Sequence, residues 1–191
     1  MGFDSETAFE SALIKCLVEE KGWKDGVIKY PTEKDLLDNW AKIIFENNRD
    51  IDRLGDFPMT DGEMAQIMGQ IAKLRTPLNL NGFINGGTVQ IIRDNENDTH
   101  NFKKTISLKI FDRNEIAAGR TRYQIAQQPK FKAKNSIYPN RRGDFCLLIN
   151  GMPVIHVELK KSNVPVSEAQ YQIRKYLYLS LIHISEPTRL A

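Results

Sequence analysis

The residues with the clearest chemical potential lie in two short stretches on either side of residue 150. Asp144 opens one apolar run, and Glu158 and Lys160 stand two residues apart at the end of another. Two carboxylates can hold a hard divalent cation such as Mg²⁺, which prefers carboxylate and water oxygens. A nearby ammonium group can stabilise the charge that develops during phosphodiester hydrolysis. These residue types predict a hydrolytic metal centre with Asp144, Glu158 and the Val157 carbonyl as metal ligands.

A β-hairpin must bring these residues together. Residues 144–149 and 154–159 are strongly apolar, and between them lies Asn150-Gly151, the dipeptide most typical of a tight hairpin turn. Side chains alternate along a strand, so Glu158 and Lys160 are expected on one face. The alternative is that they form an ordinary exposed Glu–Lys pair on an edge strand.

The face of Asp144 depends on the length of the turn. A two-residue turn would place Asp144 opposite Val157, on the wrong face for a shared site. A three-residue loop, 149–151, would place it opposite His156 and diagonal to Glu158, at a separation that suits two carboxylates sharing one metal. A shared metal site therefore predicts the three-residue loop.

Helices and further strands precede this hairpin. Apolar residues recur at helical spacing in residues 5–20, and capping patterns start two more helices at Thr32 and Thr60, the latter ended by Pro77. The remaining expected elements are strands at 88–92, 105–111 and 123–127 and a helix at 167–177. This order predicts an α/β fold with a mixed sheet flanked by helices.

Basic residues gather in the second half of the chain. Between residues 120 and 175, eleven Lys and Arg side chains face only three acidic ones, although the formal net charge of the whole chain is +3. Clustered cations release counterions when they contact phosphates, which favours double-stranded DNA as a partner. Arg141, Arg142 and Lys161 are the candidate contacts, although alternation turns Lys161 away from Lys160. The alternative is an ordinary solvated face.

Composition excludes several other classes of site. Cys16 and Cys146 are too few for a disulfide framework, and no Cys/His spacing indicates zinc. No apolar run could span a bilayer and the amino terminus is too charged for a secretory signal, so we expect a cytoplasmic location and no membrane partner. Residues 180–191 do not continue the pattern of the chain, and we expect them to be a non-native tail.

Five segments resemble one known family. They are FESALIKCLVEEKGW, LRTPLNLNGFINGG, RYQIAQQPKF, RRGDFCLLINGMPVIHVELKKS and QIRKY. Together they make residues 3–176 similar to the amino-terminal nuclease region of the restriction (R) subunit of type I restriction-modification enzymes. The motif of Asp144, Glu158 and Lys160 is of the PD-(D/E)xK kind, so the resemblance implies a restriction-endonuclease-like fold.

The resemblance implies a Mg²⁺-dependent type I site-specific deoxyribonuclease that cuts unmodified double-stranded DNA without sequence preference of its own. Residues 1–179 would be its endonuclease domain. In this family the R subunit continues into an ATP-driven motor and works with methyltransferase and specificity subunits. The chain has no Gly-x(4)-Gly-Lys-Ser/Thr phosphate loop, so ATP would be used elsewhere in a longer subunit.

The resemblance also extends the candidate site. The residues to which it assigns catalytic roles are Asp144, Glu158, Lys160, Gln172, Tyr176 and Glu10. Gln172 and Tyr176 match the Gln-x-x-x-Tyr motif of this lineage and would share one helix face. A Glu in the first helix, here Glu10, can approach the metal in such nucleases. Many relatives have Pro before the catalytic Asp, where this chain has Gly143.

Two other functions are consistent with the sequence. The chain could be another nuclease of the same fold, acting in repair or junction resolution. It could instead be a non-catalytic module that docks DNA or partner subunits.

Overall fold

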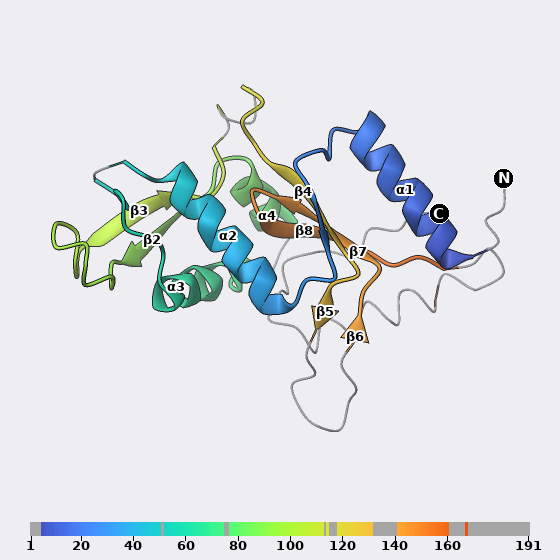
Figure 1. Cartoon of the computed structure of the whole chain (residues 1–191). Coiled ribbons are helices and arrows are strands. Elements are labelled where there is room, and N and C mark those ends of the chain that lie inside the picture. The colour runs from blue at the N-terminus through green and yellow to red at the C-terminus, as the bar shows by residue number, and fades with distance from the viewer. Residues whose placement is uncertain are drawn as a thin grey trace. The chain divides into compact units, whose positions relative to one another are not determined.

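The computed structural model describes residues 5–50, 52–74, 77–112, 114, 118–131, 141–160 and 167. The described residues fall into two compact units, one within residues 1–35 and 122–191 and the other within residues 36–121. The elements (Figure 1) are α1 (Glu6–Glu20), β1 (Val27–Lys29), α2 (Glu33–Asn47), α3 (Asp61–Ile71), α4 (Pro77–Ile84), β2 (Thr88–Ile92), β3 (Thr105–Lys109), β4 (Tyr123–Gln127), β5 (Lys130–Phe131), β6 (Arg141–Arg142), β7 (Phe145–Ile149) and β8 (Met152–Val157).

The first unit contains a mixed sheet in the order β1-β4-β7-β8. β1 pairs with β4 in parallel, whereas β4 with β7 and β7 with β8 are antiparallel. The predicted fold class, α/β with a mixed sheet flanked by helices, is confirmed. Among the helices in the described part of the chain, none is long and apolar enough to cross a membrane.

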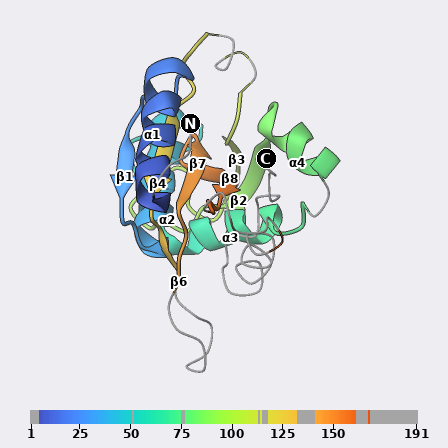
Figure 2. The same cartoon turned by 90° about the vertical axis from the view of Figure 1, so that its right-hand side faces the viewer.

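Helix α1 packs across this sheet. Its N-cap is Ser5, whose side chain accepts a hydrogen bond from the Ala8 N–H. Ile14 is buried in one cluster with sheet residues that include Ile125 and Phe145, and other apolar residues of α1 pack against that cluster. Both views show α1 beside the strands of this sheet (Figures 1 and 2). The polar residues on the inward face of α1 are therefore carried toward the sheet.

The hairpin of β7 and β8 corrects the predicted loop. Ile149 pairs with Met152, so the turn contains only Asn150 and Gly151, which have φ angles of 50° and 83°. The three-residue loop was therefore wrong. Two left-handed central residues make the tight turn whose twist matches that of the flanking strands, and Asn-Gly tolerates this conformation best.

A β-bulge restores the shared face by another route. Leu148 pairs with Pro153 but Leu147 pairs with Ile155, which leaves Val154 as an extra residue in β8. Such an insertion moves every later pair by one position. Phe145 consequently pairs with Val157.

The second unit holds α3, α4 and the antiparallel β2–β3 hairpin. The capping box predicted at Thr60 is present, because Thr60 and Glu63 each accept a hydrogen bond from the other's backbone N–H. The side-chain amide of Gln66 in α3 donates a hydrogen bond to the Ile92 carbonyl and accepts one from the Ile92 N–H. It therefore pairs with the backbone at the end of β2.

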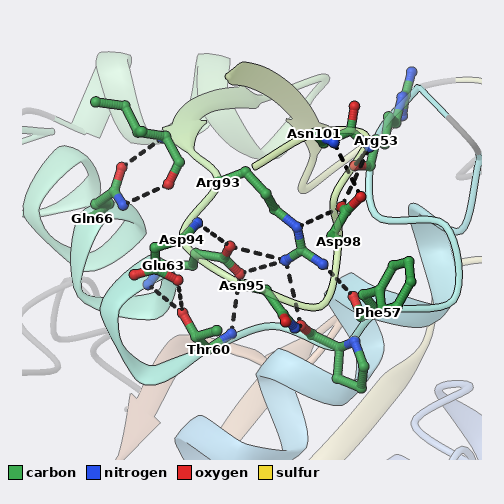
Figure 3. A network of polar contacts seen from close by, with 12 residues as sticks. Arg53, Phe57, Thr60, Glu63, Gln66, Arg93, Asp94, Asn95, Asp98 and Asn101 are labelled. Carbon is green, nitrogen blue, oxygen red and sulfur yellow. Dashed lines mark hydrogen bonds and ion pairs between the residues drawn. The ribbon is translucent and has the colours of Figure 1, made fainter. Parts of the chain in front are cut away.

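This unit contains a buried charge network (Figure 3). Arg93 is fully buried, and its guanidinium contacts Glu63 at 2.7 Å and Asp98 at 2.9 Å. The same group donates to the Phe57 carbonyl at 2.6 Å. Burial opposes ionisation of Asp98, but hydrogen bonds from Arg93 and Asn101 outweigh it and lower the pKa of that carboxyl.

Candidate active site

The bulged register brings the two motif carboxylates level with one another. Since Phe145 pairs with Val157, one further step along the same register places Asp144 beside Glu158. The Asp144 N–H donates to Glu158 Oε2 at 3.3 Å, and the Leu159 N–H donates to Asp144 Oδ2. Both side chains are half-buried at the end of the hairpin.

Burial, hydrogen bonds and neighbouring charges all affect the pKa of Asp144. Burial is the largest influence and raises this pKa. The Leu159 hydrogen bond, a side-chain hydrogen bond with Glu158 and the positive charge of Lys160 oppose the rise, while the negative charge of Glu10 adds to it. The net effect is upward, so the carboxyl retains its proton more readily than a solvated Asp. Three other candidate catalytic residues, Glu158, Lys160 and Glu10, thus act on the Asp144 carboxyl.

Glu10 of α1 is an acidic residue that is nevertheless buried at this site. The residue is only 4% exposed. Its Oε1 accepts a hydrogen bond from Gln127 Nε2 at 2.8 Å, and Gln128 Nε2 lies 3.3 Å from Oε1 and 3.1 Å from Oε2. A buried carboxylate requires such donors, because desolvation without them is costly.

Neither glutamine was predicted from the sequence. Both lie at the end of β4, within the segment RYQIAQQPKF that carries part of the family resemblance. The backbone N–H of Gln128 also donates to the Asp144 carbonyl at 2.7 Å. These two residues therefore connect the α1 carboxylate to the hairpin.

The donor set suits a hard cation that keeps part of its water shell. Asp144 and Glu158 offer carboxylate oxygens, and Val157 ends β8 directly before Glu158. Within the described ranges, no group of three or more His, Cys, Asp or Glu side chains is arranged as a ready-made metal cage. Mg²⁺ commonly binds through one or two carboxylates plus water, so the residues present fit this ion.

The remaining candidates are placed only in part. Arg142 lies in β6, is exposed, and its guanidinium carbon sits 5.3 Å from the centre of the Tyr30 ring. Arg141 pairs with Phe131 through its backbone. Lys161, Gln172 and Tyr176, and the helix expected at 167–177, lie outside the residues that the structure describes apart from residue 167.

The departure at Gly143 has a steric explanation. A Cβ at this position would lie 2.8 Å from His156 Nε2 and 3.5 Å from the Phe131 ring. His156 is 8% exposed, and burial lowers its pKa to about 4, so the ring is neutral near pH 7. The imidazole occupies space that any larger residue before Asp144 would need.

We expect Gly143→Ala to destabilise the protein by about 1–3 kcal/mol, the usual cost of forcing extra atoms into a packed site. Urea unfolding followed by circular dichroism measures the change. Adding the same substitution to a His156→Ala background removes the obstructing ring, so its cost should then largely disappear. Equal costs in both backgrounds would show that His156 is not the reason for glycine.

The comparison with known families decides the membership of the chain. The model of the type I restriction enzyme R protein N terminus matches residues 4–184. The chain belongs to this family. The match covers every described element of the site and extends five residues into the segment 180–191.

Curated relatives of the family are much longer than this chain. The endonuclease subunit of type I restriction enzyme SsaAORF53P of Staphylococcus saprophyticus is 28% identical over 180 residues, which cover 92% of the chain and 17% of that protein. The endonuclease subunit of SauCOLORF180P of Staphylococcus aureus strain COL is 28% identical over 178 residues, with the same two shares. The chain thus spans 17% of the length of these relatives.

Proposed function

We propose that the chain is the Mg²⁺-dependent endonuclease domain of a type I restriction R subunit, which hydrolyses phosphodiester bonds of unmodified double-stranded DNA. One observation carries the proposal. In a chain of this family, Asp144 and Glu158 meet at the end of a hairpin, with the charges of Lys160 and Glu10 acting on the same carboxyl. The names of the relatives, which are endonuclease subunits, support the same activity.

Each side chain has a distinct part in this chemistry. Asp144 and Glu158 would hold the cation, with the Val157 carbonyl as a further oxygen ligand. When bound, Mg²⁺ supplies charge neutralisation and activation of water. The Lys160 ammonium stabilises negative charge on the phosphate and orients the attacking water. Because Asp144 is half-buried, these electrostatic interactions are stronger than they would be in open solvent.

DNA would be held mainly through its phosphates. Arg142 presents an exposed guanidinium stacked on Tyr30, and Arg141 precedes it in β6. Phosphate contacts fix position but carry no direct sequence information. The choice of DNA would therefore come from the specificity and methyltransferase subunits, and its timing from an ATP-driven motor in the longer subunit.

Cleavage of supercoiled plasmid by the full-length R subunit, assembled with its partners and ATP, tests the proposal. We expect nicked and linear products with Mg²⁺, none with excess EDTA, and recovery when Mg²⁺ is restored. Fully methylated plasmid is the matched control and should remain intact. DNA binding with no cleavage under any divalent cation would instead indicate a docking module, and cleavage without partners or ATP would indicate a repair or junction nuclease.

A further inference from the structure

We propose that Gln128 is a positioning residue that fixes Glu10 beside Asp144, an inference that rests on the proposed nuclease site. Gln128 directly follows β4 and contacts both α1, through Glu10, and the hairpin, through Asp144. Its side-chain amide lies within hydrogen-bond distance of both Glu10 carboxylate oxygens. Its backbone N–H donates to the Asp144 carbonyl at 2.7 Å. One residue therefore joins a carboxylate of α1 to the residue that carries the hairpin carboxylate.

The two glutamines at this position are not equivalent. Gln127 is the last residue of β4, pairs with Phe145, and donates a single hydrogen bond to Glu10 Oε1. Gln128 stands after the strand and reaches both Glu10 oxygens, which restricts rotation of the carboxylate as well as its place. Gln128 is thus the residue whose loss would free Glu10 to turn relative to Asp144.

The backbone of Gln128 has a conformation that glycine would adopt at a lower energetic cost. Its φ angle is 50°, in the left-handed region that Gly and Asn adopt most readily. Glutamine has no conformational advantage there. The glutamine side chain is long enough to place its amide group on Glu10. Glycine has no amide group to place there, and the asparagine side chain is one methylene shorter.

The positive φ angle of Gln128 allows a substitution that tests the side chain without disturbing the backbone. Gln128→Asn keeps the amide and suits the positive φ, so the fold should be retained, but the shorter side chain withdraws from Glu10. Glu10→Gln removes the charge that Gln128 holds. If Gln128 acts through Glu10, the double variant should behave like Glu10→Gln alone, because interacting residues are non-additive.

The measurement is the affinity of the 191-residue chain for Mn²⁺, a paramagnetic substitute for Mg²⁺, followed by electron paramagnetic resonance. We expect Gln128→Asn to weaken Mn²⁺ binding by about 10-fold, the lower end of the range for partners that orient metal ligands. Gln66→Asn is the matched control, since it shortens a glutamine that bonds Ile92 in the other unit. Its Mn²⁺ affinity should equal that of the unchanged chain.

The outcomes separate this inference from the proposed function. If Mn²⁺ binds and Asp144→Asn abolishes binding, but Gln128→Asn binds normally, the positioning role is overturned and the nuclease site stands. If Asp144→Asn has no effect on binding, both are overturned. Independent, additive losses in Gln128→Asn and Glu10→Gln would also overturn the positioning role. Gln128→Gly repeats the test if the Asn variant unfolds, and unfolding of both would assign Gln128 a structural role instead.

Discussion

Replacing Asp144 with Asn should lower DNA cleavage by the assembled R subunit by about 10²- to 10³-fold, because it removes a ligand of the cation that would stabilise transition-state charge. The amide preserves the shape of the carboxyl, and its oxygen can still accept the Leu159 hydrogen bond. The negative charge needed to hold a divalent cation is gone. Cleavage of plasmid and hydrolysis of ATP should be measured on the same preparation.

ATP hydrolysis decides how a loss of cleavage is interpreted. It should stay nearly unchanged in Asp144→Asn, because the motor that we propose uses ATP lies outside this chain. Glu158→Ala and Lys160→Ala should show the same separation of the two activities. Asp52→Asn, an exposed Asp outside the site, should cleave normally. Parallel loss of cleavage and ATP hydrolysis would contradict a local catalytic role and point to misfolding or to a docking function.

Replacing Arg93 with Met should destabilise the second unit by about 3–5 kcal/mol, the cost of leaving a buried charge uncompensated. Glu63 and Asp98, at 0% and 2% exposure of their side chains, would lose their common partner. The control is Arg49→Met, which breaks an ion pair whose side chains are 57% and 81% exposed and should cost at most about 1 kcal/mol. Urea unfolding of both variants gives the comparison.

The pH dependence of unfolding provides a second check on Arg93. The pKa of Asp98 is lowered from 3.8, so this carboxyl stabilises the fold at pH values above 3.8. That contribution is lost as the pH falls below 3.8 and through the folded-state pKa. In Arg93→Met the lowering should become smaller, because only the Asn101 hydrogen bonds remain, and this part of the acid sensitivity should shrink with it. An unchanged profile between pH 5 and 2 would show that Arg93 does not hold the Asp98 charge.

Local signals accounted for the elements that the sequence predicted well. Apolar spacing located α1, and β-rich runs located β2 and β4 at their observed bounds. Elements defined by contacts were missed. β1 is three residues long and exists through its parallel pairing with β4. Pro77 was interpreted only as a stop, whereas it begins α4, the position where proline suits a helix.

In the candidate site too, residues close together in the sequence could be predicted, whereas contacts between residues far apart in the sequence could not. Asp144, Glu158 and Lys160 lie within seventeen residues of one another, so their spacing could be interpreted directly. The contacts between Glu10 and the two glutamines span 117 and 118 residues. No periodicity or short motif reports such a pairing. The predicted loop failed because a bulge at Val154 has no strong local signal, although the proline beside it is common at such irregularities.

The bulge also gives meaning to the spacing between the two motif carboxylates in related proteins. Here thirteen residues separate Asp144 from Glu158, and one of them, Val154, has no partner in β7. A homologue with the same turn and no bulge must delete one residue between its carboxylates to keep them level. At constant turn length, a one-residue insertion or deletion in this interval therefore keeps the carboxylates level only when a bulge is gained or lost with it. Residue counts across the hairpin, taken together with the length of the turn, would then indicate which family members share this distortion.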